Sequence, residues 1–267
     1  MQPLTNVTIT HIDTACILLE INGFRILTDP TLDNAGGLYY HGFGAASRKT
    51  ESPAIPTSGL DNIDLILLSH HQHKDNLDTA GKALLERSSA RVLSTKKAAK
   101  EMDQVTGLDN WQTVSIETSK VKNLRITATP AQHHPWWIPE FISGTVIGFI
   151  IQFDGQENGV IYISGDTVYF KGIEEVAKRY TIDIGILHAG GVQFRYLTGL
   201  GRYTMDSKDL LKSVKALNPD KIIPIHYKGW SHFKEKESSL RSSIRSSPFI
   251  KDRTIFLKPG EPLTLKN

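Results

Sequence analysis

The sequence predicts an α/β fold, and three observations support this. Strand-like segments fill the first third of the chain, strands alternate with helices in the second half, and a length of 267 residues is enough to bury a large core. The apolar and charged fractions, 39% and 22%, are ordinary for a globular protein. This length fits one large domain or two small ones. Because no Pro/Gly-rich linker and no fixed-period repeat divides the chain, we expect a single domain over residues 1–267.

Three strands are expected at the start of the chain. Residues 7–11 alternate between apolar and polar side chains, and residues 15–21 are mostly apolar. Residues 24–28 follow an Asn-Gly turn, which is a strong hairpin signal. His11 and Asp29 therefore stand at strand ends, where each is either a structural or a functional residue.

Residues 31–60 show little periodicity and are expected to form a long loop, either a binding element or an ordinary surface excursion. Later apolar runs and alternating segments predict strands at 64–68, 91–95, 113–116, 124–129, 159–164, 182–187 and 221–225. Helical spacing predicts helices at 77–87, 96–102, 171–180, 206–217 and 234–245. Asp78 and Asp206 are suitable N-caps for two of these helices.

The most distinctive stretch is Ser69–Asp78, which reads Ser-His-His-Gln-His-Lys-Asp-Asn-Leu-Asp and directly follows a predicted strand. Three histidines and two carboxylates lie within nine residues, and a strand end can direct such side chains into one small volume. Histidine and carboxylate together are the ligands of a zinc-type or iron-type site rather than of a phosphate cradle or a serine triad. The alternative is a solvated polar loop in which histidines cluster by chance.

Histidine or aspartate recurs at three later strand ends, at His133, Asp166 and His226. Residues that follow different strands can converge along one edge of packed sheets, which is where α/β architectures place their ligands. Together with the motif above, these residues predict one metal centre. Trp136 and Trp137, close to His133, either wall a pocket or bury area in the core.

The composition argues against several classes of function. A formal charge of +3 is mild, so we expect neither a nucleic acid nor a membrane as partner. Cys16 is the single cysteine, which excludes an intrachain disulfide and a cysteine-rich zinc site. The N-terminus lacks a signal-peptide pattern, and the longest apolar segment, 146–153, is too short to span a bilayer. A cytoplasmic protein is therefore expected.

Taken together, these residues resemble the metallo-β-lactamase-fold hydrolases. That family has a His-x-His-x-Asp-His loop after a strand, then a lone histidine, a bridging aspartate, and a final histidine after the last core strand. The loop at 70–76, His133, Asp166 and His226 match this order, and the resemblance extends over residues 11–232. It is closest to the bacterial branch that includes ascorbate-phosphate lactonase and the phospholipase-D-like members. The resemblance implies a four-layer αββα sandwich.

Two alignments of the loop remain open. Counted back from Asp75, the histidine pair is His71 and His73, and Asn76 occupies the position of the second-site histidine. Counted from the start of the motif, His70 is the first ligand, and a one-residue insertion makes His73 the second. We favour the second alignment, because a Ser-His or Thr-His step at the strand end usually begins the motif. In either alignment Asn76 predicts a weaker second metal position, since an amide oxygen is a poorer zinc ligand than imidazole.

The resemblance implies a metal-activated water. One or two divalent ions, with zinc expected and manganese or iron as alternatives, would lower the pKa of the bound water and supply hydroxide to the substrate. The implied metal ligands are His70, His73, Asp75, His133, Asp166 and His226. Asp166 would bridge two ions or bind one, and Asp75 would bind the second ion or orient the water. His232, or else His188, would protonate the leaving group; the alternative for both is a structural histidine.

We therefore expect a metal-dependent hydrolase acting on a small, anionic ester, lactone or phosphodiester. A nuclease is disfavoured because the chain has no room for an additional nucleic-acid-binding domain. Two other classes stay open, an iron-dependent oxidoreductase on the same fold and a non-catalytic binding protein with a weakened metal site. The identity of the bound metal separates the first of these from a zinc hydrolase, because zinc has no redox chemistry. The sequence does not predict the oligomeric state.

Overall fold

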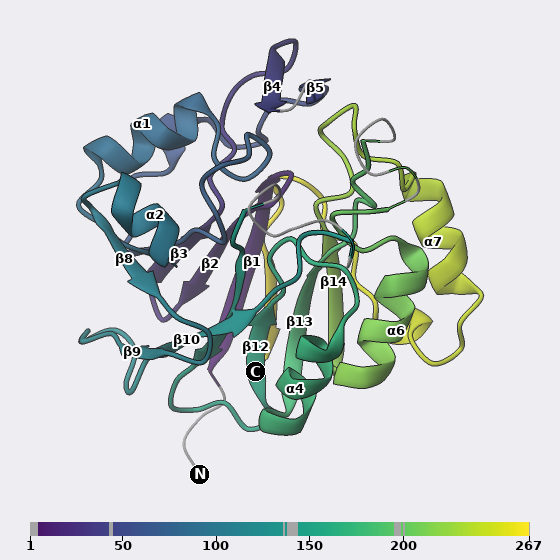
Figure 1. The fold of residues 1–267 in the computed structure, drawn as a ribbon. Coiled ribbons are helices and arrows are strands. Elements are labelled where there is room, and N and C mark those ends of the chain that lie inside the picture. The colour runs from purple at the N-terminus through teal and green to yellow at the C-terminus, as the bar shows by residue number, and fades with distance from the viewer. Residues whose placement is uncertain are drawn as a thin grey trace.

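The computed structural model describes residues 5–42, 45–135, 137, 144–194, 199 and 201–266. Within these residues the strands form a seven-stranded sheet, a six-stranded sheet and a two-stranded hairpin (Figure 1). The first sheet has the order β15 (Leu263–Lys266), β1 (Asn6–Asp13), β2 (Cys16–Ile21), β3 (Phe24–Thr28), β6 (Leu65–Leu67), β7 (Arg91–Thr95) and β8 (Val105–Leu108). The second has the order β14 (Lys221–Ile225), β13 (Ile182–His188), β12 (Val160–Ile163), β11 (Ile147–Gln152), β10 (Arg125–Pro130) and β9 (Thr113–Ser115). The hairpin pairs β4 (Leu38–Gly42) with β5 (Ala45–Arg48).

The helices cover the outer faces of the two sheets. The α-helices of the described residues are α1 (Thr79–Arg87), α2 (Lys96–Glu101), α4 (Lys171–Arg179), α6 (Ser207–Leu217) and α7 (Glu237–Arg245), with 3-10 turns at Thr57–Gly59 and Lys251–Arg253. In Figure 1, α1 and α2 lie beside the first sheet, and α4, α6 and α7 lie beside the second. The predicted four-layer αββα sandwich is therefore confirmed. None of these helices is long and apolar enough to cross a membrane.

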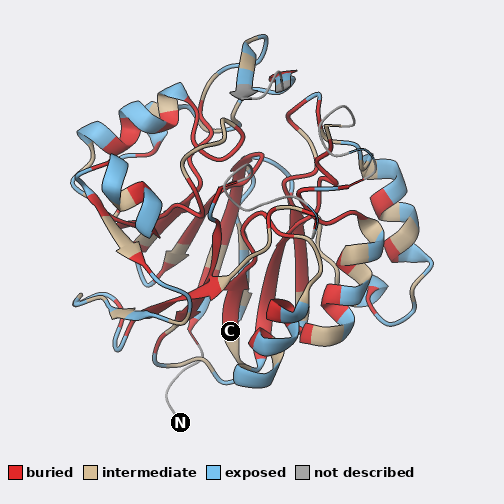
Figure 2. Cartoon of the chain, viewed as in Figure 1, coloured by how far each residue is buried: buried red, intermediate tan, exposed pale blue. Residues whose placement is uncertain are grey.

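The two sheets face each other across the main hydrophobic core. Along each strand, alternate side chains point into this core or towards the helices on the outer face. On β11, Phe149 and Ile151 point into this core, whereas Ile150 packs on the opposite face with the helices. On β2, Leu19 faces the second sheet and Leu18 faces the α1–α2 layer. Helices cover the outer faces of the sheets, and the strands are buried along most of their length, except for the edge strands β9 and β15 (Figure 2).

Two helices begin at the aspartates that the sequence indicates. The Asp78 carboxylate accepts a hydrogen bond from Gly81 N at 2.9 Å, and that of Asp206 accepts one from Asp209 N at 2.9 Å. Gly81 also lets α1 approach β3 closely, because a Cβ at this position would overlap the Pro30 carbonyl oxygen. Since Asp78 is also the last residue of the histidine motif, helix α1 begins immediately after this motif.

The segment at 31–60 differs from the predicted loop, because it contains β4, β5 and a 3-10 turn. Its second half is attached to the segment that follows β14. Thr50 N donates to Gly229 O at 2.8 Å, and Ser231 N donates to Arg48 O at 3.0 Å. The hairpin therefore holds a segment that is about 180 residues away in sequence.

Candidate metal centre

Residues of the predicted site follow strands from both sheets. His70 follows β6 of the first sheet, whereas His133, Asp166 and His226 follow β10, β12 and β14 of the second. Strands β12, β13 and β14 are parallel neighbours (Figure 1), so their carboxyl ends lie together at one edge. His188 is the last residue of β13, between the other two. Strand order thus explains how residues distant in sequence reach one place.

His70, His73 and His133 form the first cluster. His73 Nδ1 lies 3.1 Å from His70 Nε2 and 3.1 Å from His133 Nε2. Two ligand atoms about 2.1 Å from one tetrahedral ion lie about 3.4 Å apart, so the observed spacings are close to those of a metal site. All the ring atoms that face one another are suitable metal ligands.

The protonation state of these three rings is suited to binding a cation between them. His133 Nδ1 donates a hydrogen bond to the Tyr203 carbonyl oxygen at 2.9 Å, so its Nε2 carries a lone pair. Burial lowers the pKa of His70, His73 and His133, which keeps the rings neutral. A proton on His73 Nδ1 could satisfy only one of its two neighbours, whereas a cation would accept lone pairs from all three rings.

Asp166, His188 and His226 form the second cluster, and all three are buried. Asp166 Oδ1 lies 2.7 Å from His188 Nδ1 and 3.5 Å from His226 Nε2. Burial raises the pKa of Asp166 to about 7 and lowers that of His188 to about 3. A divalent cation would favour the ionised carboxylate and would bind a neutral imidazole, so both groups are suited to one.

Asp75 connects the second cluster to His232. Its Oδ2 accepts a hydrogen bond from His232 Nε2 at 3.0 Å and lies 3.5 Å from His226 Nε2. Burial alone would raise the pKa of Asp75, but the neighbouring imidazoles of His226 and His232 lower it well below its usual value. Asp166 Oδ2 lies 3.9 Å from His133 Nδ1, so Asp166, a member of the second cluster, lies next to a residue of the first.

Several buried polar atoms of the centre have no hydrogen-bond partner within the described part of the chain: Asn76 Oδ1, Asp166 Oδ2, His188 Nε2, and both ring nitrogens of His226. Leaving each such atom unpaired costs about 1–3 kcal/mol, which a bound ion or its water would offset. His226 also has a left-handed backbone, with φ of 59°, a strain that is concentrated at functional sites. Neutral imidazoles and carboxylates in this arrangement fit one or two divalent ions.

The structure brings together His70 and His73, as in the alignment we favoured. His71 points elsewhere, since its Nε2 lies 2.7 Å from Glu101 Oε2 at the end of α2. The other predicted residues, Asp75, His133, Asp166, His226 and His232, all lie within this centre. Trp136 lies outside the described residues, and Trp137 is 49% exposed, so the core alternative is wrong for Trp137.

Asp29 and Ser69 are supporting residues whose role the sequence did not reveal. The Asp29 carboxylate accepts a hydrogen bond from Ser69 N at 2.7 Å, and Ser69 Oγ lies 3.0 Å from His70 Nδ1. This contact joins the end of β3 to the start of the histidine loop, and fixes the orientation of the His70 ring. The sequence placed Asp29 at a strand end, which drew attention to it. Its hydrogen-bond partner Ser69 could not be predicted, because that contact depends on the pairing of β3 with β6.

Lys49 is a second residue that the sequence gave no reason to select. Its side chain is fully buried and forms ion pairs with Asp13 and with Asp78, the latter at 3.3 Å. Its Nζ also lies 5.4 Å from the centre of the Trp230 ring, two residues before His232. The ammonium therefore links β1, the start of α1 and the segment that carries His232.

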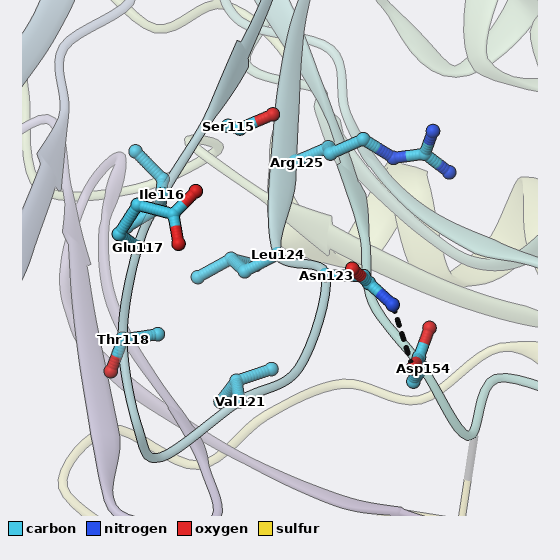
Figure 3. A pocket seen from close by; sticks show the side chains of 9 residues that line it. All are labelled: Ser115, Ile116, Glu117, Thr118, Val121, Asn123, Leu124, Arg125 and Asp154. Atoms are coloured by element: carbon cyan, nitrogen blue, oxygen red, sulfur yellow. Dashed lines mark hydrogen bonds between the residues drawn. The ribbon is translucent and has the colours of Figure 1, made fainter.

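A separate hollow of about 280 Å³ lies at the β9–β10 end of the second sheet (Figure 3). Its lining includes Arg125 and Asp154, and the Asn123 amide donates to the Asp154 carboxylate at 2.9 Å. Arg125 begins β10, whereas His133 follows the other end of this strand. The hollow is therefore not part of the metal centre.

A protein-family model described as the beta-lactamase superfamily domain matches residues 24–227. A metal-dependent hydrolase from Pyrococcus furiosus is 28% identical over 97% of this chain and 100% of its own length. Another metal-dependent hydrolase, from Caldivirga maquilingensis, is 26% identical over 94% of this chain and 95% of its own. The matched range includes every predicted ligand of the two clusters.

Solved structures show the same fold. The isothiocyanate hydrolase from Delia radicum gut bacteria superposes with a TM-score of 0.80 at 22% identity, covering 97% of this chain and 100% of that one. The diiron β-hydroxylase CmlA from Streptomyces venezuelae has a TM-score of 0.67 at 15% identity, covering 100% of this chain and 55% of that one. At these identities the likeness concerns the fold alone, which serves hydrolases and oxidoreductases in these two structures.

Proposed function

The chain belongs to the family of the beta-lactamase superfamily domain, and on this premise we propose that it is a metal-dependent hydrolase of a small, anionic ester, lactone or phosphodiester. The observation that carries the proposal is the group of three neutral imidazoles in which His73 Nδ1 lies 3.1 Å from a ring nitrogen of each of the other two. Such an arrangement is costly in a protein unless it binds a cation. The relatives' description as metal-dependent hydrolases agrees with it.

A divalent ion in this centre would lower the pKa of a coordinated water towards neutrality and polarise the bond to be hydrolysed. His70, His73 and His133 would hold the first ion, and Asp166 would face both positions. Asp29 would keep the His70 ring oriented through its hydrogen bond with Ser69, and the Tyr203 carbonyl would orient the His133 ring directly.

His232 is the residue we assign to proton transfer. The Asp75 carboxylate accepts from His232 Nε2, which fixes the proton on that nitrogen. Phe194 stacks on the His232 ring, with centroids 5.2 Å apart and planes at 16°, and so fixes the plane of the imidazole. In this position His232 Nδ1 would accept the proton released by the activated water and pass it to the leaving group, while Asp75 stabilises the charged ring.

The proposed substrate class rests on the charge and the walls of the centre. Two divalent ions would leave a net positive site, which favours an anionic substrate over a neutral one. The rings of Phe194 and Tyr203 lie 6.3 Å apart beside His232 and His133 respectively, and would provide apolar contact. Zinc is the proposed metal because nitrogen ligands predominate; the carboxylates are also compatible with manganese or iron.

The test is a hydrolysis screen of the purified protein loaded with zinc, manganese or iron(II). Chromogenic esters, aliphatic lactones and bis(p-nitrophenyl) phosphate represent the three bond types. We expect turnover of at least one type, lost in His133→Ala and preserved in the matched histidine variant His71→Gln. Oxygen-dependent chemistry with iron alone would instead favour the oxidoreductase, and metal binding without any turnover would favour a binding protein.

A further inference from the structure

We propose that Asp166, His188 and His226 hold a second metal ion. His188 would supply the imidazole that Asn76, at the position of the second-site histidine, lacks. This inference rests on the proposed function, since it assumes that the first cluster binds a metal. It reverses the sequence prediction of a weak second position. It also removes His188 from the candidates for proton donor.

The strand order places His188 where a ligand is needed. Asp166 follows β12, His188 ends β13 and His226 follows β14, and these three strands are adjacent and parallel. The carboxyl ends of such strands lie together at one edge of the sheet, so residues at the ends of all three reach one place. The register agrees, because His188 pairs with Ile225, the residue before His226.

Asn76 is a weaker candidate for this ligand than His188. Its amide nitrogen donates a hydrogen bond to Ser69 Oγ at 3.4 Å, and an amide nitrogen has no lone pair for a metal. The remaining donor atom is the amide oxygen, and a neutral amide oxygen is a poorer zinc ligand than imidazole. The imidazole of His188 is therefore the better ligand for the second position.

His188 itself is buried too deeply to serve a substrate directly. Its side chain is fully buried, and its ring stacks on that of His226 with centroids 5.1 Å apart and planes at 17°. Its Nδ1 contacts Asp166, and its Nε2 has no hydrogen-bond partner within the described residues. One ring nitrogen of His188 lies within 4.8 Å of ligand atoms of both Asp166 and His226, so this buried ring is placed to bind a metal ion together with them.

The spacing of the donor atoms around His226 fits a metal ion at this second position. His226 Nε2 lies 3.5 Å from Asp166 Oδ1 and 3.5 Å from Asp75 Oδ2. These values agree with the separation of about 3.4 Å expected for ligands of one tetrahedral ion. With His188, the second position has two imidazoles and one carboxylate, and Asp75 stands next to it as a further oxygen donor.

The experiment is a cobalt(II) titration of the metal-free full-length protein, read by visible absorption and by elemental analysis of the bound metal. The variants are His188→Gln, Asn76→Ala and, as the matched control, His71→Gln, whose ring binds Glu101 instead. We expect about two equivalents in wild type, Asn76→Ala and His71→Gln, and about one in His188→Gln. Circular dichroism shows whether each variant is folded.

A second measurement needs no variant. Proton NMR of the cobalt-loaded wild type resolves the exchangeable N–H protons of imidazoles bound to the paramagnetic ion. Five such signals are expected if His188 is a ligand, one for each of His70, His73, His133, His188 and His226. Four signals would exclude it, even if His188→Gln does not fold.

The outcomes separate this inference from the proposed function. Two equivalents in His188→Gln, or a loss in Asn76→Ala alone, would overturn the assignment of His188. One equivalent in wild type would overturn the second site and leave a mononuclear hydrolase standing. A wild-type protein that binds no cobalt would overturn the proposed function itself.

Discussion

Replacing Lys49 by Met should destabilise the protein strongly, because it leaves two buried carboxylates without their cation. Lys49 is fully buried and pairs with Asp13 and Asp78. Removing one partner of a buried ion pair typically costs about 3–5 kcal/mol. For a chain of this size about 1 kcal/mol lowers the melting temperature by about 2–4 °C, so a decrease of about 10 °C is expected.

The loss of stability in Lys49→Met should increase as the pH rises. Burial raises the pKa of Asp13 to about 6, although the Lys49 ammonium lowers it. A carboxyl whose folded pKa lies above its unfolded value stabilises the fold most when it is protonated, and this contribution is lost as the pH rises through the folded pKa. Without Lys49 the pKa of Asp13 rises further. The Lys49→Met deficit should therefore be larger at pH 8 than at pH 5.

Urea unfolding of wild type and variant at both pH values measures this directly. The double variant Lys49→Met/Asp13→Asn is the matched control, because it removes both members of one pair. It should recover part of the lost stability and weaken the pH dependence. An unchanged unfolding midpoint in Lys49→Met, or a deficit equal at both pH values, would refute the buried ion-pair argument.

Four further results are expected. His232→Gln should reduce kcat by about 10²–10⁴-fold with unchanged metal content, if His232 donates the proton; equal loss of metal would show that it holds the centre together instead. Gly81→Ala should cost about 1–3 kcal/mol in unfolding free energy, because its Cβ would overlap the Pro30 carbonyl, and a neutral result would refute that close approach. Asp206→Ala should cost about 1 kcal/mol through the lost N-cap of α6; retention of the cap by Asp206→Asn is the control. Removal of the metal by a chelator should lower the melting temperature, since an ion at 1,000-fold above its Kd stabilises the fold by about 4 kcal/mol; zinc should restore it.

The features predicted correctly from the sequence are those with local signals. Asp78 and Asp206 cap helices because each precedes a run with helical spacing, and their hydrogen bonds reach only three residues ahead. His133, Asp166 and His226 could be selected because each follows an apolar strand, and the parallel arrangement of β12 to β14 brings the last two together; that they bind a metal stays a prediction.

The features that were not predicted depend on contacts between distant parts of the chain. Strand β15 pairs with β1 across the whole length of the chain, and its four residues are too few for a periodicity argument. The proposed role of His188 depends on β13 lying between β12 and β14, and the ion pairs of Lys49 depend on three separate segments meeting around one ammonium. No local pattern encodes such neighbours.

The central claim is that the buried histidines and aspartates form a metal centre. Its most direct test is elemental mass spectrometry of protein purified without chelators or an affinity metal, alongside His133→Ala. Wild type should retain divalent metal, and His133→Ala should lose that of the first cluster while staying folded. A wild type that contains no metal and takes up none on reconstitution, or that matches His133→Ala in content, would contradict the claim.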